Sequence, residues 1–391
     1  MIKMKNFKKN SNYIFVIVTL GVFIISFYIL SYIYTRNITK SQTIVIRDSA
    51  LEDTTIKNTL PEFHVDKILS SNIAYPIFGL EVLDNNSILF RTDSSKNGNT
   101  YNYISTLALE NNIRNDIAAS EKNSFYNVIL SPDGKNMAYS ISNFDGNFTT
   151  YIYDLEGKKN LYVFDNSSSL QLFINSKLYV GVKDNVLFLL DLDSNDKKDI
   201  INLKEFTDGA AKGISDIKNL KSLFNIKAGS DENIIYIYNI ISYGNGSTFT
   251  NIFDINIKSG KFSTIKLDGY INNLISLDDS NLLIEGAINK DHGIFIYNTK
   301  NKSYKILKEG NAYNLTITSD YKKIAYQYFN NKDTNELHVA NFNMDKIEAD
   351  TVIYSDQKYG NHMKWSRDNK MLFYIIDSEE GSTIYRFMFS S

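Results

Sequence analysis

The chain has 391 residues, with 42 Lys and Arg against 44 Asp and Glu, a formal net charge of -2, and no cysteine. The near-neutral balance supplies no basic face, so no nucleic-acid partner is predicted. The absence of cysteine excludes disulfides, thiolate metal sites, a cysteine nucleophile and a lipidated N-terminal cysteine. The 27 Tyr and 24 Phe are attributed to strand propensity rather than to carbohydrate stacking.

Near the N-terminus, residues 13–34 read YIFVIVTLGVFIISFYILSYIY and contain no charged side chain. At about 1.5 Å per residue, this run is long enough to cross a hydrocarbon core of about 30 Å. More basic residues precede the run than closely follow it, so the positive-inside rule places the N-terminus in the cytoplasm. A cleaved signal peptide is the alternative, but no small-x-small cleavage site follows.

These features predict a short cytoplasmic tail at 1–12, a transmembrane signal anchor at 13–34, a stalk at 35–52 and an extracytoplasmic domain at 53–391. The lipid bilayer would contact the chain through 13–34. The predicted location is therefore the cell membrane, in single-pass form, with the large domain outside.

From residue 82 onward, one short pattern recurs. Each copy has an Asp in third place, a turn residue in fourth place and then an apolar run, except the copy at 174–180, which is shorter and has lost the Asp. The Asp side chain can accept hydrogen bonds from backbone N–H groups just ahead, and the fourth position favours Gly or Asn with φ > 0. By this rule Tyr321 predicts a distorted turn or a turn of another type, whereas Asn85 fits. Copies stand at 82–90 (VLDNNSILF), 131–139 (SPDGKNMAY), 318–326 (TSDYKKIAY) and 366–374 (SRDNKMLFY), with weaker ones at 174–180, 229–237 and 276–284.

The residues around each copy also repeat. A strand precedes the Asp turn, and a second strand, a polar loop, a third strand, a tight turn and a more polar fourth strand follow it. Seven such four-stranded antiparallel units, spaced about 40–55 residues apart, are typical of a β-propeller. The final unit lacks its fourth strand, so we expect either 54–60 or 63–69 to pair antiparallel with the last strand and close the ring. Residues 207–221 fit the pattern poorly and predict an insertion with a short helix.

The repeat resembles the TolB-type, WD40-like propeller repeat known as PD40. The seven units predict an all-β, seven-bladed propeller, with six or eight blades as alternatives. The resemblance implies a protein of six or seven blades that is extracytoplasmic and binds proteins or peptides. It also implies that the turn residues are structural. The matching residues are Ser131, Pro132, Asp133, Gly134, Lys135, Ala138 and Tyr139, followed by YIYDL at 151–155 and Gly157–Lys158.

No residue pattern predicts catalytic, cofactor-binding or metal-ligating residues. The G-x-S-x-G elbow of hydrolases is absent, and GNGST at 244–248 lacks its spacing. The residues of 191–196 resemble the start of a calcium loop without its Gly and Glu, so a solvated turn is predicted there. The paired acids 278–279 and 379–380 lie in turns. Trp365 is expected to pack between blades. The four histidines, His64, His292, His338 and His362, show no ligand spacing.

The leading hypothesis is a membrane-anchored propeller that binds an envelope protein or peptide, without enzymatic activity and without a cofactor. One alternative is a propeller hydrolase or lyase acting on a glycan or peptide, with carboxylates at the ring axis. Another is a structural envelope or spore component. The sequence leaves the oligomeric state open.

Overall fold

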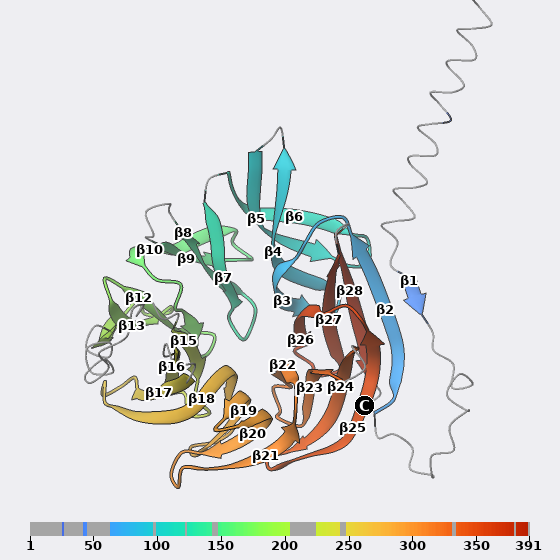
Figure 1. Ribbon diagram of the computed structural model, residues 1–391. Coiled ribbons are helices and arrows are strands. Elements are labelled where there is room, and N and C mark those ends of the chain that lie inside the picture. Colours follow the sequence, from blue (N-terminus) through green and yellow to red (C-terminus); the bar gives the residue numbers. More distant parts are fainter. Residues whose placement is uncertain are drawn as a thin grey trace, which may run out of the picture.

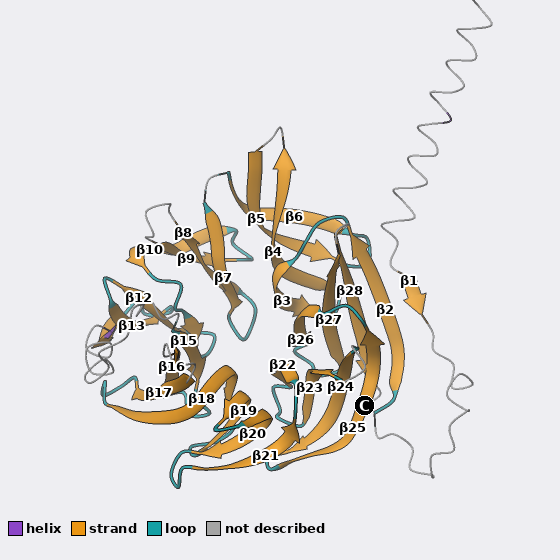
Figure 2. Cartoon of the chain, viewed as in Figure 1, coloured by secondary structure: helices purple, strands orange, loops and turns teal. Residues whose placement is uncertain are grey.

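The computed structural model describes residues 63–389 except 97–98, 122, 143–147, 204–223, 243–247, 331–333 and 379–380, together with Ser26 and 42–44. The described chain consists mainly of β-strands, as Figure 2 shows. The predicted anchor at 13–34 lies outside the described residues apart from Ser26, and so do most of the predicted stalk and the predicted insertion. Within the described residues, no helix is long and apolar enough to span a bilayer.

Antiparallel strands follow one another along the chain in groups of four, here called units. The first unit is one sheet, made of β3 (Phe78–Asp84), β4 (Ser87–Lys96), β5 (Asn99–Ala108) and β6 (Ile113–Ser120). The next two units share an eight-stranded sheet and meet at the pair Ser167↔Lys183. Their strands are β7 (Ser124–Leu130), β8 (Asn136–Ser142), β9 (Phe148–Asp154), β10 (Lys159–Ser167), β11 (Leu172–Phe173), β12 (Leu178–Lys183), β13 (Val186–Asp191) and β14 (Lys197–Asn202).

The following two units share a seven-stranded sheet, because β18 serves both. Residues of β18 up to Asp268 pair with β17, and those from Gly269 onward pair with β19. Gly269 has φ +134°, and a Cβ there would lie 2.0 Å from the Ala287 carbonyl oxygen, so this crossing point requires glycine. The strands are β15 (Asn225–Ala228), β16 (Ile234–Ser242), β17 (Thr248–Asn256), β18 (Phe262–Ser276), β19 (Asn281–Ile288), β20 (Asp291–Asn298) and β21 (Ser303–Glu309).

Two further sheets complete the ring. One consists of β22 (Ala312–Ile317), β23 (Lys323–Phe329), β24 (Asn335–Asn343) and β25 (Lys346–Asp356). The other has the order β1-β2-β28-β27-β26. Its strands are β1 (Gln42–Ile44), β2 (Val65–Ile73), β26 (Gly360–Trp365), β27 (Met371–Ser378) and β28 (Gly381–Phe389).

The sheets are arranged radially, with the first strand of each unit nearest a common centre (Figure 1). These innermost strands contact one another in a closed cycle: β26 contacts β3, and contacts continue through β7, β11, β15, β18 and β22 back to β26. The predicted all-β, propeller-like arrangement is therefore confirmed.

Strand β2 closes the ring. It pairs antiparallel with β28 over eight positions from Val65↔Phe389 to Ile73↔Ser382. Of the two sequence-predicted closing segments, the one at 63–69 is correct. Ile68 of β2 and Phe387 of β28 lie in one buried cluster with Trp365, which is 6% exposed. The predicted packing of Trp365 in the interior is confirmed.

The repeated Asp turns have one common structure. In three of them the Asp Oδ1 accepts a 2.6 Å hydrogen bond from the Ser or Thr two positions earlier and a longer one from the backbone N–H two positions later. The residue after Asp has φ between +58° and +71°, including Tyr321. The prediction of a distorted turn at Tyr321 was therefore wrong. Asn85 is not among the positive-φ residues, because β3 and β4 join through a tighter Asp84↔Ser87 pair.

Candidate functional site

The ring has two distinct faces, and the Asp turns gather on one of them, here called the turn face. Asn85 donates to the Asp368 carboxylate at 2.9 Å, and Ser319 N–H donates to Asn369 at 3.0 Å. Arg367 reaches from the last unit to the carbonyl of Asp133, at 2.7 Å. Turns from several units are thus tied together. The innermost strands begin at the opposite face.

At this opposite face the innermost strands carry bulges, so we call it the bulge face. The strand register skips Gly79, Asn272 and Asn361 by one residue each, and it skips two residues beginning at Asn127 and at Asn314. Three of these residues have positive φ: Gly79 at 90°, Asn127 at 42° and Asn314 at 56°. Gly and Asn tolerate that conformation, and a bulge leaves backbone groups without ladder partners.

Side chains from the second strand of one unit bond the bulge of the next unit. Glu285 accepts the Leu315 N–H at 2.7 Å, while Gln327 donates to the Gly360 carbonyl at 2.8 Å and accepts its N–H at 3.1 Å. Arg91 likewise donates to the Phe125 carbonyl. Each of these three side chains stands seven positions after a turn Asp. These strands were predicted to be apolar and this role was not predicted, although Gln327 inside the run IAYQY is a polar residue that could have indicated it.

Charged side chains lie on the innermost strands. Lys364 of β26 forms an ion pair with Glu81 of β3 in the neighbouring unit. The charges of Lys364, Glu285 and Glu81 also influence the pKa of Lys227, which stands on β15, another innermost strand of the ring (Figure 1). Three of the four groups, Glu81, Lys227 and Lys364, therefore stand on innermost strands, nearest the common centre of the ring. Both carboxylates are engaged: Glu81 is paired with Lys364, and Glu285 accepts the Leu315 N–H.

Burial sets the protonation preferences of these groups. Burial is the main cause that lowers the pKa of Lys227, and the nearby Lys364 charge adds to it. Burial raises the pKa of Glu285, although the Leu315 N–H opposes this shift by binding the carboxylate. Both groups therefore carry their charge at an energetic cost at neutral pH.

Exposed aromatic side chains gather at the bulge-face ends of the innermost strands. Tyr359 is 54% exposed, Phe78 43% and Tyr126 40%. Tyr359 stacks on Phe329 with centroids 6.2 Å apart, and its ring lies 6.1 Å from that of Tyr313. We call these five side chains the aromatic surface. Large exposed aromatic groups near one another are typical of protein-binding surfaces.

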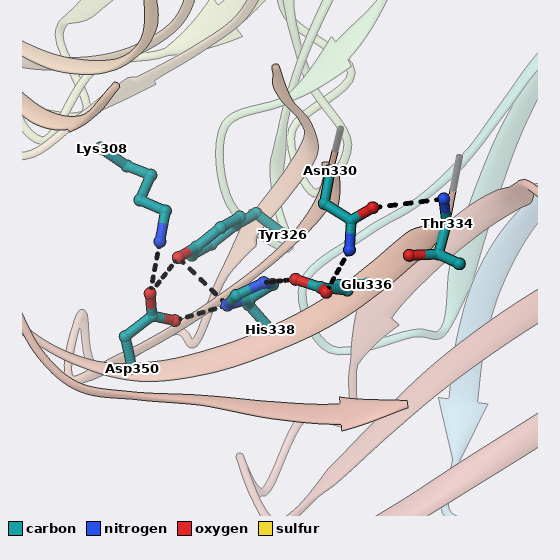
Figure 3. Close-up of polar contacts among 7 residues, drawn as sticks. All are labelled: Lys308, Tyr326, Asn330, Thr334, Glu336, His338 and Asp350. Carbon is teal, nitrogen blue, oxygen red and sulfur yellow. Dashed lines mark hydrogen bonds and ion pairs between the residues drawn. The ribbon is translucent and has the colours of Figure 1, made fainter. Parts of the chain in front are cut away.

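A second polar cluster joins two neighbouring units (Figure 3). His338 on β24 is the centre: its Nδ1 lies 2.8 Å from Asp350 of β25, and its Nε2 lies 3.2 Å from Glu336. The Tyr326 ring stacks on the His338 ring at 4.9 Å. Asp350 also accepts hydrogen bonds from the Tyr326 hydroxyl at 2.7 Å and from Lys308 of β21, in the preceding unit, at 2.8 Å.

The electrostatics of this cluster are dominated by Asp350. Burial alone would raise its pKa, but hydrogen bonds from His338, Lys308 and Tyr326 outweigh burial and hold the pKa below the ordinary value of 3.8. Burial and the Asp350 charge raise the pKa of Tyr326 above its ordinary value. Asp350 already accepts from three donors, so the cluster acts as a link between units.

Other residues that the sequence analysis weighed are spread over the ring. His362 accepts the Gly79 N–H at 2.8 Å, His292 lies near the Tyr270 hydroxyl, and His64 is exposed. Asp191 accepts backbone N–H groups of 193 and 194, as in the predicted solvated turn. Asp278 caps its own turn. The segments 244–247 and 379–380 lie outside the described residues.

Sequence comparison gives no family for this chain. No protein-family model matches it, and no curated protein matches it.

Comparison with solved structures shows the fold. The β-propeller domain of the Trilobed protease from Pyrococcus furiosus aligns with a TM-score of 0.55 and 15% identity, over 81% of this chain and 96% of that one. A structure of two prolyl endopeptidases has a TM-score of 0.55 and 10% identity over 81% of this chain, which spans about half (48%) of that one. A chain of the Mitotic Checkpoint Complex has a TM-score of 0.52 and 11% identity, over 86% and 96% of the two chains.

These neighbours correct one prediction. The chain was expected not to be an enzyme, and that exclusion was wrong, because structures with this fold include those of proteases and prolyl endopeptidases. At 10% and 15% identity the likeness concerns the fold, so the chemistry of this chain has to be judged from its own residues.

Proposed function

We propose that the chain is a seven-bladed propeller that binds an extended segment of an envelope protein or peptide on its bulge face. Each blade would be one unit of four strands, with β2 completing the last blade. The closed cycle of contacts among the innermost strands supports this count.

The observation that carries the binding role is the aromatic surface. It combines three strongly exposed rings at the bulge-face ends of innermost strands with two rings that pack against one of them, Tyr359: Tyr313 of β22 and Phe329 at the end of β23. The turn face differs, because side chains and backbone groups of neighbouring turns are bonded to one another there. Bulges also occur next to binding sites more often than elsewhere.

The test is peptide selection on the purified full chain in detergent, followed by measurement of the selected peptides. We expect Tyr126→Ala combined with Tyr359→Ala to weaken binding at least tenfold. Phe262→Ala is the matched control, since Phe262 is 46% exposed but lies at the start of β18, on the outer part of its unit. Failure to enrich any peptide, or an equal loss in the control, would contradict the proposal. Mass spectrometry of the recovered peptide then separates binding from hydrolysis.

We also propose that residues 13–34 anchor the chain in the cell membrane with the propeller outside. The support is the uncharged apolar run and its basic N-terminal flank. Because the chain has no cysteine, a single Asn301→Cys change in an exposed turn gives a unique label site. A membrane-impermeant maleimide should label this variant in intact cells. Labelling only after lysis would refute the orientation.

A further inference from the structure

We propose that Lys227 binds a carboxylate group of the ligand near the ring axis, an inference that rests on the proposed binding function and specifies its chemistry. The ligand would therefore present an acidic side chain or a free C-terminus between the innermost strands.

The position of Lys227 within its unit supports this role. Lys227 and Lys364 each stand four residues before a turn Asp, at Asp231 and Asp368, so they occupy equivalent places on innermost strands. On β15 the preceding residue, Ile226, packs into the core between units. Because side chains alternate along a strand, Lys227 extends from the other side of the sheet.

The two equivalent lysines differ in their partners. Lys364 is paired with Glu81. No hydrogen bond or ion pair joins the Lys227 ammonium to any residue of the described parts of the chain. The two carboxylates whose charges act on it are engaged elsewhere: Glu81 by Lys364, and Glu285 by the Leu315 N–H.

An ammonium group in this setting favours an anionic partner. Lys227 is partly buried, so it has lost hydration but can still be reached from solvent. Burying a charge without a hydrogen-bonding partner is costly, and a ligand carboxylate would supply the missing acceptor. The Lys227 site therefore complements the aromatic surface: rings would contact the apolar part of a ligand and the ammonium its acidic group.

The test is thermal unfolding of the full chain in sodium succinate against sodium chloride at equal ionic strength. We expect succinate to raise the Tm in a saturable, concentration-dependent way, because a ligand that binds only the folded state stabilises it. Neutral succinamide should have no such effect. In Lys227→Met the succinate-specific shift should disappear, and in Lys227→Arg, which keeps the cation, most of it should remain.

The matched control is Lys300→Met, which removes an exposed lysine from a turn and should leave the shift unchanged. Absence of a succinate-specific shift in the unmodified chain, or an equal shift in Lys227→Met, would overturn the proposal. Near-UV circular dichroism of Lys227→Met checks that the variant is folded. If the succinate shift behaves as expected but no peptide binds, the Lys227 site stands and the peptide-binding function fails. If peptides bind but succinate gives no specific shift, only the Lys227 site is refuted.

Discussion

Glu285 shows how one residue type changes the energetics of a repeated contact. Glu285 and Gln327 stand at equivalent positions of neighbouring units, and each binds the backbone of the following bulge. Gln327 makes this contact without charge. Glu285 makes it with a carboxylate whose pKa is raised by burial.

We predict that Glu285→Gln is at least as stable as the unmodified chain at pH 7. A raised pKa means that the folded state holds the proton more tightly, so the stability contributed by Glu285 falls as pH rises above the ordinary value of 4.5. A Gln side chain keeps an acceptor for the Leu315 N–H but does not ionise, so it avoids this loss of stability at higher pH. Urea unfolding at pH 4.5 and pH 7 measures the effect. The reverse change, Gln327→Glu, should destabilise the chain at pH 7, and a destabilised Glu285→Gln would refute the explanation.

At the scale of strands, the His338 cluster shows how neighbouring units are linked. Strand pairing sets Tyr326 directly opposite His338. Asp350 follows on the next strand and reaches back to both, and Lys308 comes from the unit before. A polar network that is fully hydrogen-bonded in a half-buried site specifies how adjacent elements pack.

We predict that Asp350→Asn lowers the free energy of unfolding by about 1–3 kcal/mol at pH 7, because charge-assisted hydrogen bonds to Lys308 and His338 are lost. The lowered pKa of Asp350 means that its contribution is present above the ordinary value of 3.8 and is lost as pH falls below it. Stability measured between pH 7 and pH 3 should therefore fall less steeply in the variant.

Asp345→Asn is the control for this experiment. Asp345 pairs with Lys305 at 3.6 Å, but its side chain is 69% exposed, so the change should cost little. Equal losses of unfolding free energy in the two variants would show that the network around Asp350 contributes no more stability than an exposed ion pair.

The turns could be predicted from the sequence, because each depends on residues that are close together in the chain. The Asp in third place identified the turns, although the geometry at Tyr321 was mispredicted. The missing fourth strand of the last unit limited the closing strand to 54–60 or 63–69, without deciding between them. The Tyr326–His338–Asp350 contacts were not predicted, because they depend on strand register across three strands and on a bulge at His338. The Lys227 site was not predicted either, because a sequence does not show whether a lysine side chain has a hydrogen-bond or ion-pair partner in the folded chain.

At the scale of the whole molecule, the ring depends on pairing between strands at opposite ends of the described chain. We predict that Asn72→Cys combined with Thr383→Cys forms a disulfide in the otherwise cysteine-free chain, because these residues are directly opposite each other on β2 and β28. The bond should stabilise the fold by about 2–4 kcal/mol, since it constrains a long loop of the unfolded chain. Non-reducing electrophoresis and urea unfolding measure both effects.

The control for the crosslink is Asn72→Cys with Asn301→Cys, which should remain reduced because Asn301 lies in a turn of another unit. Absence of a crosslink between 72 and 383 under oxidising conditions would show that β2 does not close the ring.

The same closure has a consequence for synthesis on the ribosome. Strand β2 is translated roughly 300 residues before β28, and at about 5–20 residues per second this amounts to roughly 15–60 s. During that interval the edge of β2 that pairs with β28 has no partner, and its apolar Ile68 and Ile73 lack the cover that β28 gives them. The nascent chain therefore exposes an aggregation-prone strand edge until its last strand emerges. A chaperone that binds 65–73 during this interval would be expected to raise the yield of folded protein.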